Sequence, residues 1–214
     1  MKPTAIDLFA GCGGFSNGFT QAGFEITHAV EFDATIAETY AKTQIIVDDI
    51  KNVDESQILP TADIIIGGPP CQGFSMAGAR IRGGFADDSR NYLFKHYFNI
   101  VKTVQPKIFV MENVKGIQTM NKGAIFAEII RLFENIGYNV QYSVFNASDF
   151  GVPQNRERMV IMGVRKTEKM GKTDKKAENW DFSACIKMHK ISPKPHFGMP
   201  FTIWKICQRT AQRQ

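Results

Sequence analysis

The sequence predicts an α/β protein built on a mostly parallel, twisted β-sheet with helices on both faces. Short apolar runs alternate with helix-patterned segments from about residue 4 to residue 165, as in chains where helices connect parallel strands. Of the 214 residues, 43% are hydrophobic and 11% are aromatic, so the chain can bury a sizeable core. No internal repeat interrupts the alternation.

Strands are predicted where a short apolar run ends in a glycine or polar turn. TAIDLFA runs into the turn GCGG, and ADIIIGG runs into a long polar segment. The last two runs have no helical pattern between them, which predicts an antiparallel pair at one end of the sheet. The predicted strands cover residues 4–10, 25–31, 44–50, 62–68, 107–114, 138–147 and 158–165.

Helices are predicted where apolar residues recur with helical spacing between these strands. Pro106 stops the third of them and Gly137 ends the fourth. Residues 69–90 are polar and glycine-rich without a clear period, and a loop of that length is typical of a functional segment. The predicted helices cover residues 15–22, 34–43, 91–105 and 123–137.

Charge divides the chain into two predicted regions. Residues 1–164 carry 14 basic and 17 acidic side chains, a net charge of −3, whereas residues 165–214 carry 12 and 4, a net charge of +8. We therefore expect one α/β domain over 1–165 and a basic, poorly patterned tail over 166–214. Such a tail suits nucleic acid, although a solvated, disordered tail has the same composition.

Cysteine spacing and hydropathy exclude several classes of protein. The four cysteines are scattered, none forms CxxC, and none has a histidine at metal-ligand spacing, which argues against a zinc site or a disulfide framework. No apolar run reaches the length of about 20 residues that a membrane helix needs, and the N-terminus has no signal-peptide pattern. We expect a soluble, cytoplasmic protein with no metal.

The turn after the first predicted strand is a candidate ligand site. Gly11, Gly13 and Gly14 permit a tight turn and close approach of a ligand to the backbone. The helix that follows favours a negative group at its N-terminus. A dinucleotide-binding GxGxxG pattern would need glycine at position 16, where this chain has Ser16, so the pattern argues against NAD.

Polar and aromatic residues at the next two strand ends fit an adenosine. Glu31 lies about 20 residues after the glycine turn, where a carboxylate can accept hydrogen bonds from ribose hydroxyls. Phe32 could lie on an adenine ring, and Asp49 could accept from its amino group. Taken singly, Phe32 as a core residue and Asp48 and Asp49 as loop residues are the simpler interpretations. Together, the three successive strand ends favour adenosine.

Cys71, in the segment GGPPCQGFS, is a candidate nucleophile. Pro69 and Pro70 stiffen the approach to it, and a reachable thiol with a lowered pKa is nucleophilic. Glu112 ends the predicted strand beside it, and a carboxyl group next to a thiol makes sense if it works protonated and donates to a substrate ring nitrogen. Arg156 and Arg158 could orient a base, although with Glu157 they could instead form a structural salt-bridge cluster.

Four segments in order, DLFAGCGGFSNGF, GGPPCQGFS, MENVKGI and FGVPQNRERMVIMGV, resemble the cytosine-C5 DNA methyltransferase family, and its bacterial restriction–modification members in particular. The resemblance covers about residues 4–165 and implies a Rossmann-like, S-adenosylmethionine-dependent methyltransferase fold, with 1–165 as the cofactor-binding catalytic domain. The implied cofactor contacts are Phe9, Gly11, Gly13, Gly14, Glu31, Phe32, Asp49, Ile50, Pro70 and Leu93.

The resemblance also implies the chemistry. Cys71 would attack C6 of a cytosine flipped out of double-stranded DNA, while Glu112 engages N3 and the exocyclic amine. Arg158 would hold the base carbonyl, with Arg156 in support. Arg80, Arg82 and Arg90, in the long loop, could reach DNA phosphates. A tRNA cytosine-C5 methyltransferase and a non-catalytic chain that binds nucleic acid or a partner are the alternatives.

The chain departs from the family after residue 165. Complete members continue with a target-recognition region, a conserved stretch and a segment bearing a GNS-type motif, and the 49 residues after Arg165 are too few for all three. The tail then resembles the start of a recognition region. A split enzyme whose second chain supplies recognition, a truncated product and a fragment of a longer protein are the alternatives, and each predicts incomplete activity for this chain alone.

Overall fold

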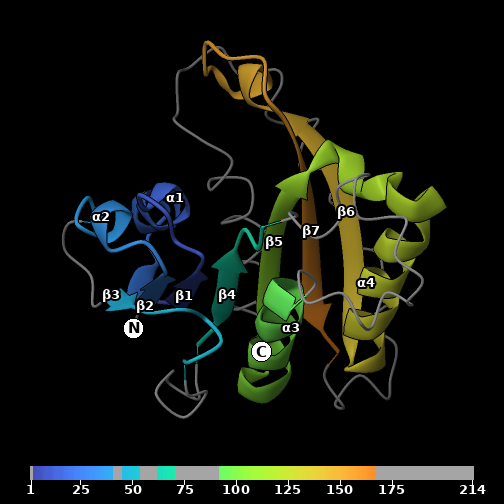
Figure 1. Ribbon diagram of the computed structural model, residues 1–214, viewed down its shortest axis with the longest axis horizontal. Coiled ribbons are helices and arrows are strands. Elements are labelled where there is room, and N and C mark those ends of the chain that lie inside the picture. Colours follow the sequence, from blue (N-terminus) through green and yellow to red (C-terminus); the bar gives the residue numbers. More distant parts are fainter. Residues whose placement is uncertain (1, 41–44, 54–61, 71–91, 167–214) are drawn as a thin grey trace.

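Seven strands form one sheet in the computed structural model, which describes residues 2–40, 45–53, 62–70 and 92–166 (Figure 1). The strand order is β3-β2-β1-β4-β5-β7-β6. All neighbours from β3 to β5 are parallel, whereas β7 runs antiparallel to both β5 and β6. The strands are β1 Thr4–Leu8, β2 Glu25–Glu31, β3 Ile45–Val47, β4 Ile64–Gly67, β5 Ile108–Val114, β6 Tyr138–Asn146 and β7 Glu157–Arg165.

The helices alternate with the strands as predicted. The antiparallel pair at one end of the sheet is also confirmed, although a short 3-10 helix that the sequence did not predict lies between its strands. The α-helices are α1 Gly14–Gln21, α2 Ala34–Ala37, α3 Tyr92–Val104 and α4 Ala124–Asn135, and the 3-10 helices are η4 Lys115–Gln118, η5 Met120–Gly123 and η6 Ala147–Phe150.

Several elements are shorter than predicted, α2 and β3 among them. α2 spans only Ala34–Ala37, and the prediction that it continued to 43 extends into 41–44, outside the described residues. β3 ends at Val47 rather than at residue 50. There, the Asp48 and Asp49 side chains accept from backbone N–H groups of nearby residues, so they close a turn instead of continuing the strand.

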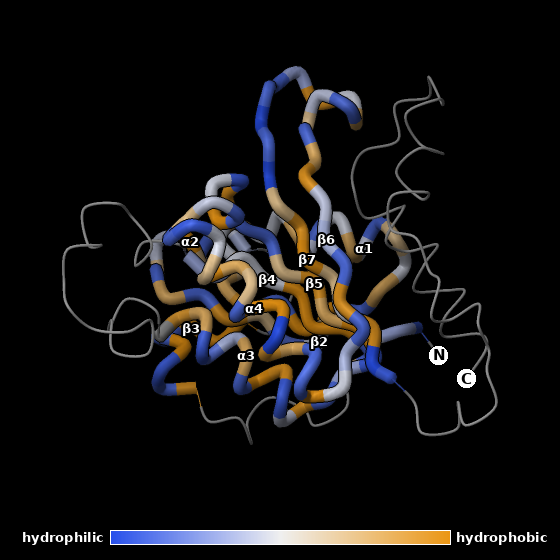
Figure 2. Tube along the Cα trace, turned by 90° about the vertical axis from the view of Figure 1, so that its right-hand side faces the viewer, coloured by the Kyte–Doolittle hydropathy of each residue, from blue (hydrophilic) through white to orange (hydrophobic). Residues whose placement is uncertain are grey.

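Both faces of the sheet are covered by helices, as predicted. On one face, Phe19 of α1 and Ala22, the residue after this helix, pack in one cluster with Ile64 and Ile66 of β4. On the other face, α3 and α4 pack against the alternate strand residues, such as Phe109 and Met111. Figure 2 shows the resulting hydrophobic centre, with β5 and β7 largely orange. None of the helices in the described ranges is long and apolar enough to cross a membrane.

Candidate functional site

The predicted site residues come from adjacent strand ends. Because β2, β1, β4 and β5 are parallel neighbours, their carboxyl ends lie along one edge of the sheet. The glycine turn follows β1, Phe32 follows β2, and Glu112 lies near the end of β5. In Figure 1 the connection between β6 and β7 projects beyond this edge.

Glu31 fastens the glycine turn to the neighbouring strand. Its Oε2 accepts from the Gly11 N–H at 2.7 Å, and its Oε1 accepts from the Asp33 N–H at 3.0 Å. Gly11 and Gly13 have φ angles of 55° and 81°, a conformation that glycine adopts without a steric penalty. Each carboxylate oxygen has a second lone pair, so Glu31 keeps the capacity to accept from a ligand.

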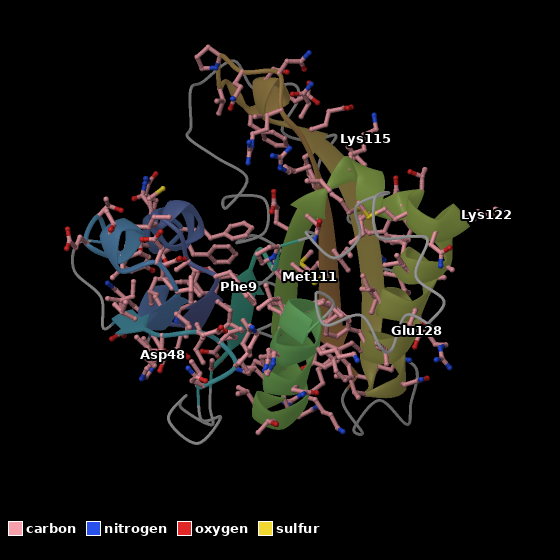
Figure 3. All side chains as sticks on the ribbon, in the orientation of Figure 1. Phe9, Asp48, Met111, Lys115, Lys122 and Glu128 are labelled. Carbon is pink, nitrogen blue, oxygen red and sulfur yellow. The ribbon has the colours of Figure 1, made fainter. Side chains whose placement is uncertain are left out.

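Two aromatic side chains flank this turn. Phe32 is 72% exposed, so its interpretation as a core residue is wrong. Phe9 has a φ of 59°, a left-handed conformation that costs a residue other than glycine about 1–3 kcal/mol and clusters at functional sites. Phe9 also packs against the main core cluster, and Figure 3 shows it beside the end of β4.

The end of β3 is occupied by local contacts. Asp49 Oδ1 accepts from the Lys51 N–H at 3.1 Å, and Asp49 Oδ2 lies 3.4 Å from Lys51 Nζ. Ile50 is only 4% exposed and belongs to the same core cluster against which Leu93 packs. The loop interpretation of Asp48 and Asp49 therefore agrees with their contacts, and a ligand role for Asp49, Ile50 and Leu93 stays a prediction.

Glu112 projects from β5 on the same face of the sheet as α1. Ile108 and Val110, at alternate positions of the strand, point to that face and are buried by apolar neighbours. Glu112 follows two residues later, where its Oε1 lies 2.9 Å from Arg158 Nε. Since Val114 is opposite Arg158 in the register, the acid and the guanidinium are diagonal neighbours on adjacent strands.

Burial decides the protonation behaviour of Glu112. Removal from water raises the pKa of the Glu112 carboxyl above its usual value, and this effect outweighs the nearby positive charges of Arg158 and Arg156. The carboxyl group also lies close to Gly68, the residue that follows β4. A Cβ placed on Gly68 would lie 3.1 Å from Glu112 Oε2. A carboxyl group with a raised pKa is thus held beside the segment that leads to Cys71.

Asn113, which the sequence analysis did not single out, holds the proline segment. Its side chain is buried, and its Nδ2 donates to the Pro69 carbonyl at 3.1 Å. Pro70 is exposed and is the last described residue of this segment. Cys71 itself, like Arg80, Arg82 and Arg90, lies outside the described residues.

The arginine motif divides between the site and the surface. Arg158 pairs with Glu112, whereas Glu157 pairs with Lys115 at 2.8 Å. Arg156 is exposed, and its backbone N–H donates to Asn146 Oδ1 at 3.0 Å. Figure 3 places Lys115 near the base of the projecting β6–β7 connection. In place of one salt-bridge cluster of Arg156, Glu157 and Arg158, the described residues therefore show two separate ion pairs, one of which includes Glu112.

A buried polar cluster behind the glycine turn was also missed. Asp7 on β1 is fully buried, and its Oδ2 accepts from both the N–H and the hydroxyl of Ser16, at 3.1 and 2.6 Å. The Ser16 hydroxyl also contacts the Tyr40 hydroxyl. The available signal was a carboxylate in the middle of an otherwise apolar strand.

The described residues include no group of three or more His, Cys, Asp or Glu side chains that could hold a metal ion.

Comparison with known proteins gives a consistent result. A family model described as C-5 cytosine-specific DNA methylase matches residues 4–200. The type II methyltransferase M1.HphI of Haemophilus parahaemolyticus is 48% identical over 172 residues, which are 76% of this chain and 46% of that protein. M.FnuDI of Fusobacterium nucleatum, also a type II methyltransferase, is 42% identical over 204 residues, which are 94% of this chain and 55% of that protein.

Solved structures agree on the fold. The crystal structure of S. pombe Dnmt2 methyltransferase superposes with a TM-score of 0.69 at 20% identity, covering 90% of this chain and 57% of that chain. At that identity the likeness concerns the fold, and it confirms the prediction of a Rossmann-like methyltransferase sheet. The chain spans about half the length of the curated relatives it matches.

Proposed function

The chain belongs to the C-5 cytosine-specific DNA methylase family, and from this premise we propose that it carries the catalytic half of a DNA (cytosine-5-)-methyltransferase of the restriction–modification type. Residues 1–165 form its catalytic domain. The substrate is cytosine in double-stranded DNA, in the cytoplasm, and a second chain or a further segment supplies target recognition. The basic residues after 165 add affinity for the phosphate backbone.

One observation carries the proposal. The Glu112 carboxyl, whose pKa is raised by burial, lies against Gly68 at the end of the adjacent strand and is paired with Arg158 at 2.9 Å. Three residues after Gly68 the chain reaches Cys71. In the proposed reaction of a cytosine ring, the thiol would bond to C6 and the protonated acid would donate to N3. The guanidinium would donate to the carbonyl oxygen.

In the proposed mechanism, the Cys71 thiolate forms a bond to C6 of the flipped cytosine. Glu112 donates its proton to N3, so the ring accepts the electron pair without building up negative charge. The electron pair then available at C5 would form the new C–C bond to the methyl group as the sulfonium–methyl bond breaks, with the electrons of that bond staying on the sulfur of the departing donor. Loss of the C5 proton to a base, expulsion of Cys71 from C6 as thiolate and return of the N3 proton to Glu112 would restore the aromatic ring and the starting enzyme.

The residues at the first two strand ends fit the methyl donor. S-adenosylmethionine, when bound, supplies an electrophilic methyl group. The exposed Phe32 ring offers a stacking surface for its adenine, and Glu31 keeps lone pairs for ribose hydroxyls. Phe9, Gly11, Gly13 and Gly14 shape the turn that approaches the donor, while Asp49, Ile50, Pro70 and Leu93 complete the proposed contacts.

The test is methyl transfer by the wild-type chain and by the Cys71→Ser variant. With tritiated S-adenosylmethionine, unmethylated bacterial DNA and a target-recognition region added as a second chain, we expect label in 5-methylcytosine for the wild type and no turnover for the variant. Calorimetry should show that the variant still binds the donor, because the substitution leaves the glycine turn intact. Normal methyl transfer by Cys71→Ser would refute the nucleophile assignment.

The substrate is tested in parallel. Duplex DNA and tRNA are offered at equal nucleotide concentrations under the same conditions. We expect labelled DNA and unlabelled tRNA. Label in tRNA alone would favour the tRNA methyltransferase alternative. Donor binding without transfer to either nucleic acid, even with a recognition region added as a second chain, would favour a non-catalytic role.

A further inference from the structure

The cluster behind the glycine turn joins two segments that the proposed donor site needs together. Tyr40 follows α2, whereas Ser16 lies in the first turn of α1. The Tyr40 hydroxyl contacts the Ser16 hydroxyl, which in turn donates to Asp7 Oδ2 at 2.6 Å. The Ser16 hydroxyl has one hydrogen, which it donates to the Asp7 carboxyl. The Tyr40 hydroxyl is therefore the donor to Ser16.

The Tyr40 ring supports the turn directly. A Cβ placed on Gly13 would lie 2.9 Å from the ring carbons Cδ2 and Cε2 of Tyr40, so the ring lies against the Gly13 backbone. The ring also packs with Ala10, at the start of the turn, and with Ala29 of β2 in a small core cluster. Tyr40 therefore contacts the turn through its apolar body and the helix that follows through its hydroxyl.

Asp7 completes the connection to the sheet. Its Oδ2 accepts from the Ser16 backbone N–H as well as from the hydroxyl, which satisfies a free N–H of the first helical turn. Its Oδ1 is buried and has no hydrogen-bond partner among the described residues. The Asp7 side chain thus anchors the start of α1 to β1 through Oδ2. Removal of the Ser16 hydroxyl would take away one of the two hydrogen bonds that this buried oxygen accepts.

We propose that Tyr40 is a positioning residue for the methyl-donor site, holding the turn at residues 9–14 against the β2 end that carries Glu31 and Phe32. The inference rests on the proposed function, because it assigns the donor to that turn. In this role Tyr40 acts on the turn and on α1, and not on the donor or the base directly. Its ring packs on Gly13, and its hydroxyl fixes α1 through Ser16 and Asp7.

Amide hydrogen exchange in the ligand-free chain tests the positioning role. The N–H groups of Gly11, Gly13 and Ser16 donate to Glu31, Ala10 and Asp7, respectively. Tyr40→Phe keeps the ring and removes the hydroxyl, and we expect exchange at Gly13 and Ser16 to become about fivefold faster. Unchanged exchange at both amides would overturn the role.

Tyr138→Phe is the matched control. Tyr138 is also buried, and its hydroxyl donates to the Pro106 carbonyl at 2.8 Å, just before β5 begins. Removing this hydroxyl deletes a comparable hydrogen bond elsewhere in the sheet, so exchange at Gly13 and Ser16 should stay at the wild-type rate. Equal acceleration by both variants would show a general loss of stability and would overturn the role.

A double-mutant cycle separates the relay from local packing. Ser16→Ala breaks the same connection from its other side, so the Ser16→Ala and Tyr40→Phe double variant should exchange no faster at Gly13 than the faster of the two single variants. Independent, multiplied effects would contradict a relay through Ser16.

Donor affinity is the second readout. Calorimetry with S-adenosylmethionine should give a Kd about fivefold weaker for Tyr40→Phe and unchanged for Tyr138→Phe. If the wild-type chain bound no donor, the proposed function would fail on that result. The exchange experiment uses no ligand and still decides whether Tyr40 fixes the turn.

Discussion

At the scale of single residues, the site depends on a contest between burial and charge. Glu112 is paired with Arg158 at 2.9 Å, an arrangement that by itself would keep the acid ionised. Burial nevertheless raises the Glu112 pKa. The outcome is an acid with a raised pKa in fixed geometry, as the proposed donation of a proton to a cytosine ring nitrogen requires. Glu128 provides the contrast, since its exposed pair with Arg131 lowers the Glu128 pKa.

The first prediction concerns this balance. Replacing Arg158 with methionine should raise the Glu112 pKa further, because the largest favourable charge is removed while burial remains. Carbon-13 NMR titration of labelled glutamate side chains measures it directly, with Glu128 as an internal reference that should not move. A wild-type Glu112 pKa below its usual value would contradict burial as the dominant cause, and a pKa that fell in the Arg158→Met variant would contradict the opposing effect of Arg158.

The second prediction concerns Asp7, whose pKa burial raises to about 7. Between about pH 4 and pH 7 the folded chain holds a proton on Asp7 that the unfolded chain has released, so stability should fall as pH rises, by up to about 1.4 kcal/mol per unit. Ser16, Tyr40 and Glu31 are the polar groups that act on this carboxyl or share its cluster.

Urea unfolding of the wild type and of Asp7→Asn from pH 4 to pH 8 checks this prediction. The asparagine side chain does not titrate, so the stability of the variant relative to the wild type should increase steadily up to about pH 7 and then level off. Parallel stability profiles for the two chains would show that Asp7 does not titrate in this range.

At the scale of elements, β7 fits between β5 and β6 because of one small residue. Gly163 of β7 lies opposite Phe109 of β5, and a Cβ there would come within 2.0 Å of the Phe109 ring. That ring stacks on Phe133 of α4 at 4.0 Å and meets Tyr138 of β6 edge-on at 5.2 Å. The lack of a side chain at Gly163 therefore lets the cluster of Phe109, Phe133 and Tyr138 pack together across β5, β6, β7 and α4.

The third prediction is that Gly163→Ala destabilises the fold by about 2–3 kcal/mol, because the Phe109 ring is fully buried and has no space to move away. Gly116→Ala is the control, since a Cβ at that position has no neighbour within 4 Å, and its effect should stay within about 0.5 kcal/mol. Urea unfolding compares the two, and equal effects would contradict the packing argument.

At the scale of the whole molecule, the charge of the chain is unevenly distributed. The total is +5, whereas residues 1–164 carry −3. A region with a net negative charge has little long-range attraction for a polyanion, so the proposed affinity for DNA would come from local basic contacts and from the residues after 165. The division into a domain and a basic tail stays a prediction, because 167–214 lie outside the described residues.

The fourth prediction follows from that division. Replacing Lys169, Lys172, Lys175 and Lys176 with glutamine should weaken DNA binding and make it less dependent on salt. Each phosphate that these lysines neutralise contributes about 0.9 to the logarithmic salt slope, and the substitution should remove that contribution. Fluorescence anisotropy with labelled duplex DNA between low and moderate salt measures the slope. An unchanged slope would assign these lysines to solvent rather than to DNA.

The order and type of the elements, and the residue types at the strand ends, could be predicted from the amino-acid sequence without coordinates. β2 was predicted at its observed bounds, and the glycine turn, Glu31, Phe32 and Glu112 were found from periodicity and position. These features depend on local spacing, which a sequence displays directly. The ends of α2 and β3 were predicted less well, because side chains such as Asp48 compete with the regular backbone pattern.

Contacts between residues far apart in the chain required the folded structure. The insertion of β7 beside β5 brings Arg158 onto Glu112, and the packing of the segment after α2 against the glycine turn brings Tyr40 onto Ser16 and Gly13. Neither contact leaves a periodic signal, because strand order and helix packing depend on the burial of whole faces rather than on neighbouring residues. The residue types of the proposed site could therefore be predicted from the chain, whereas their geometry is a property of the folded sheet.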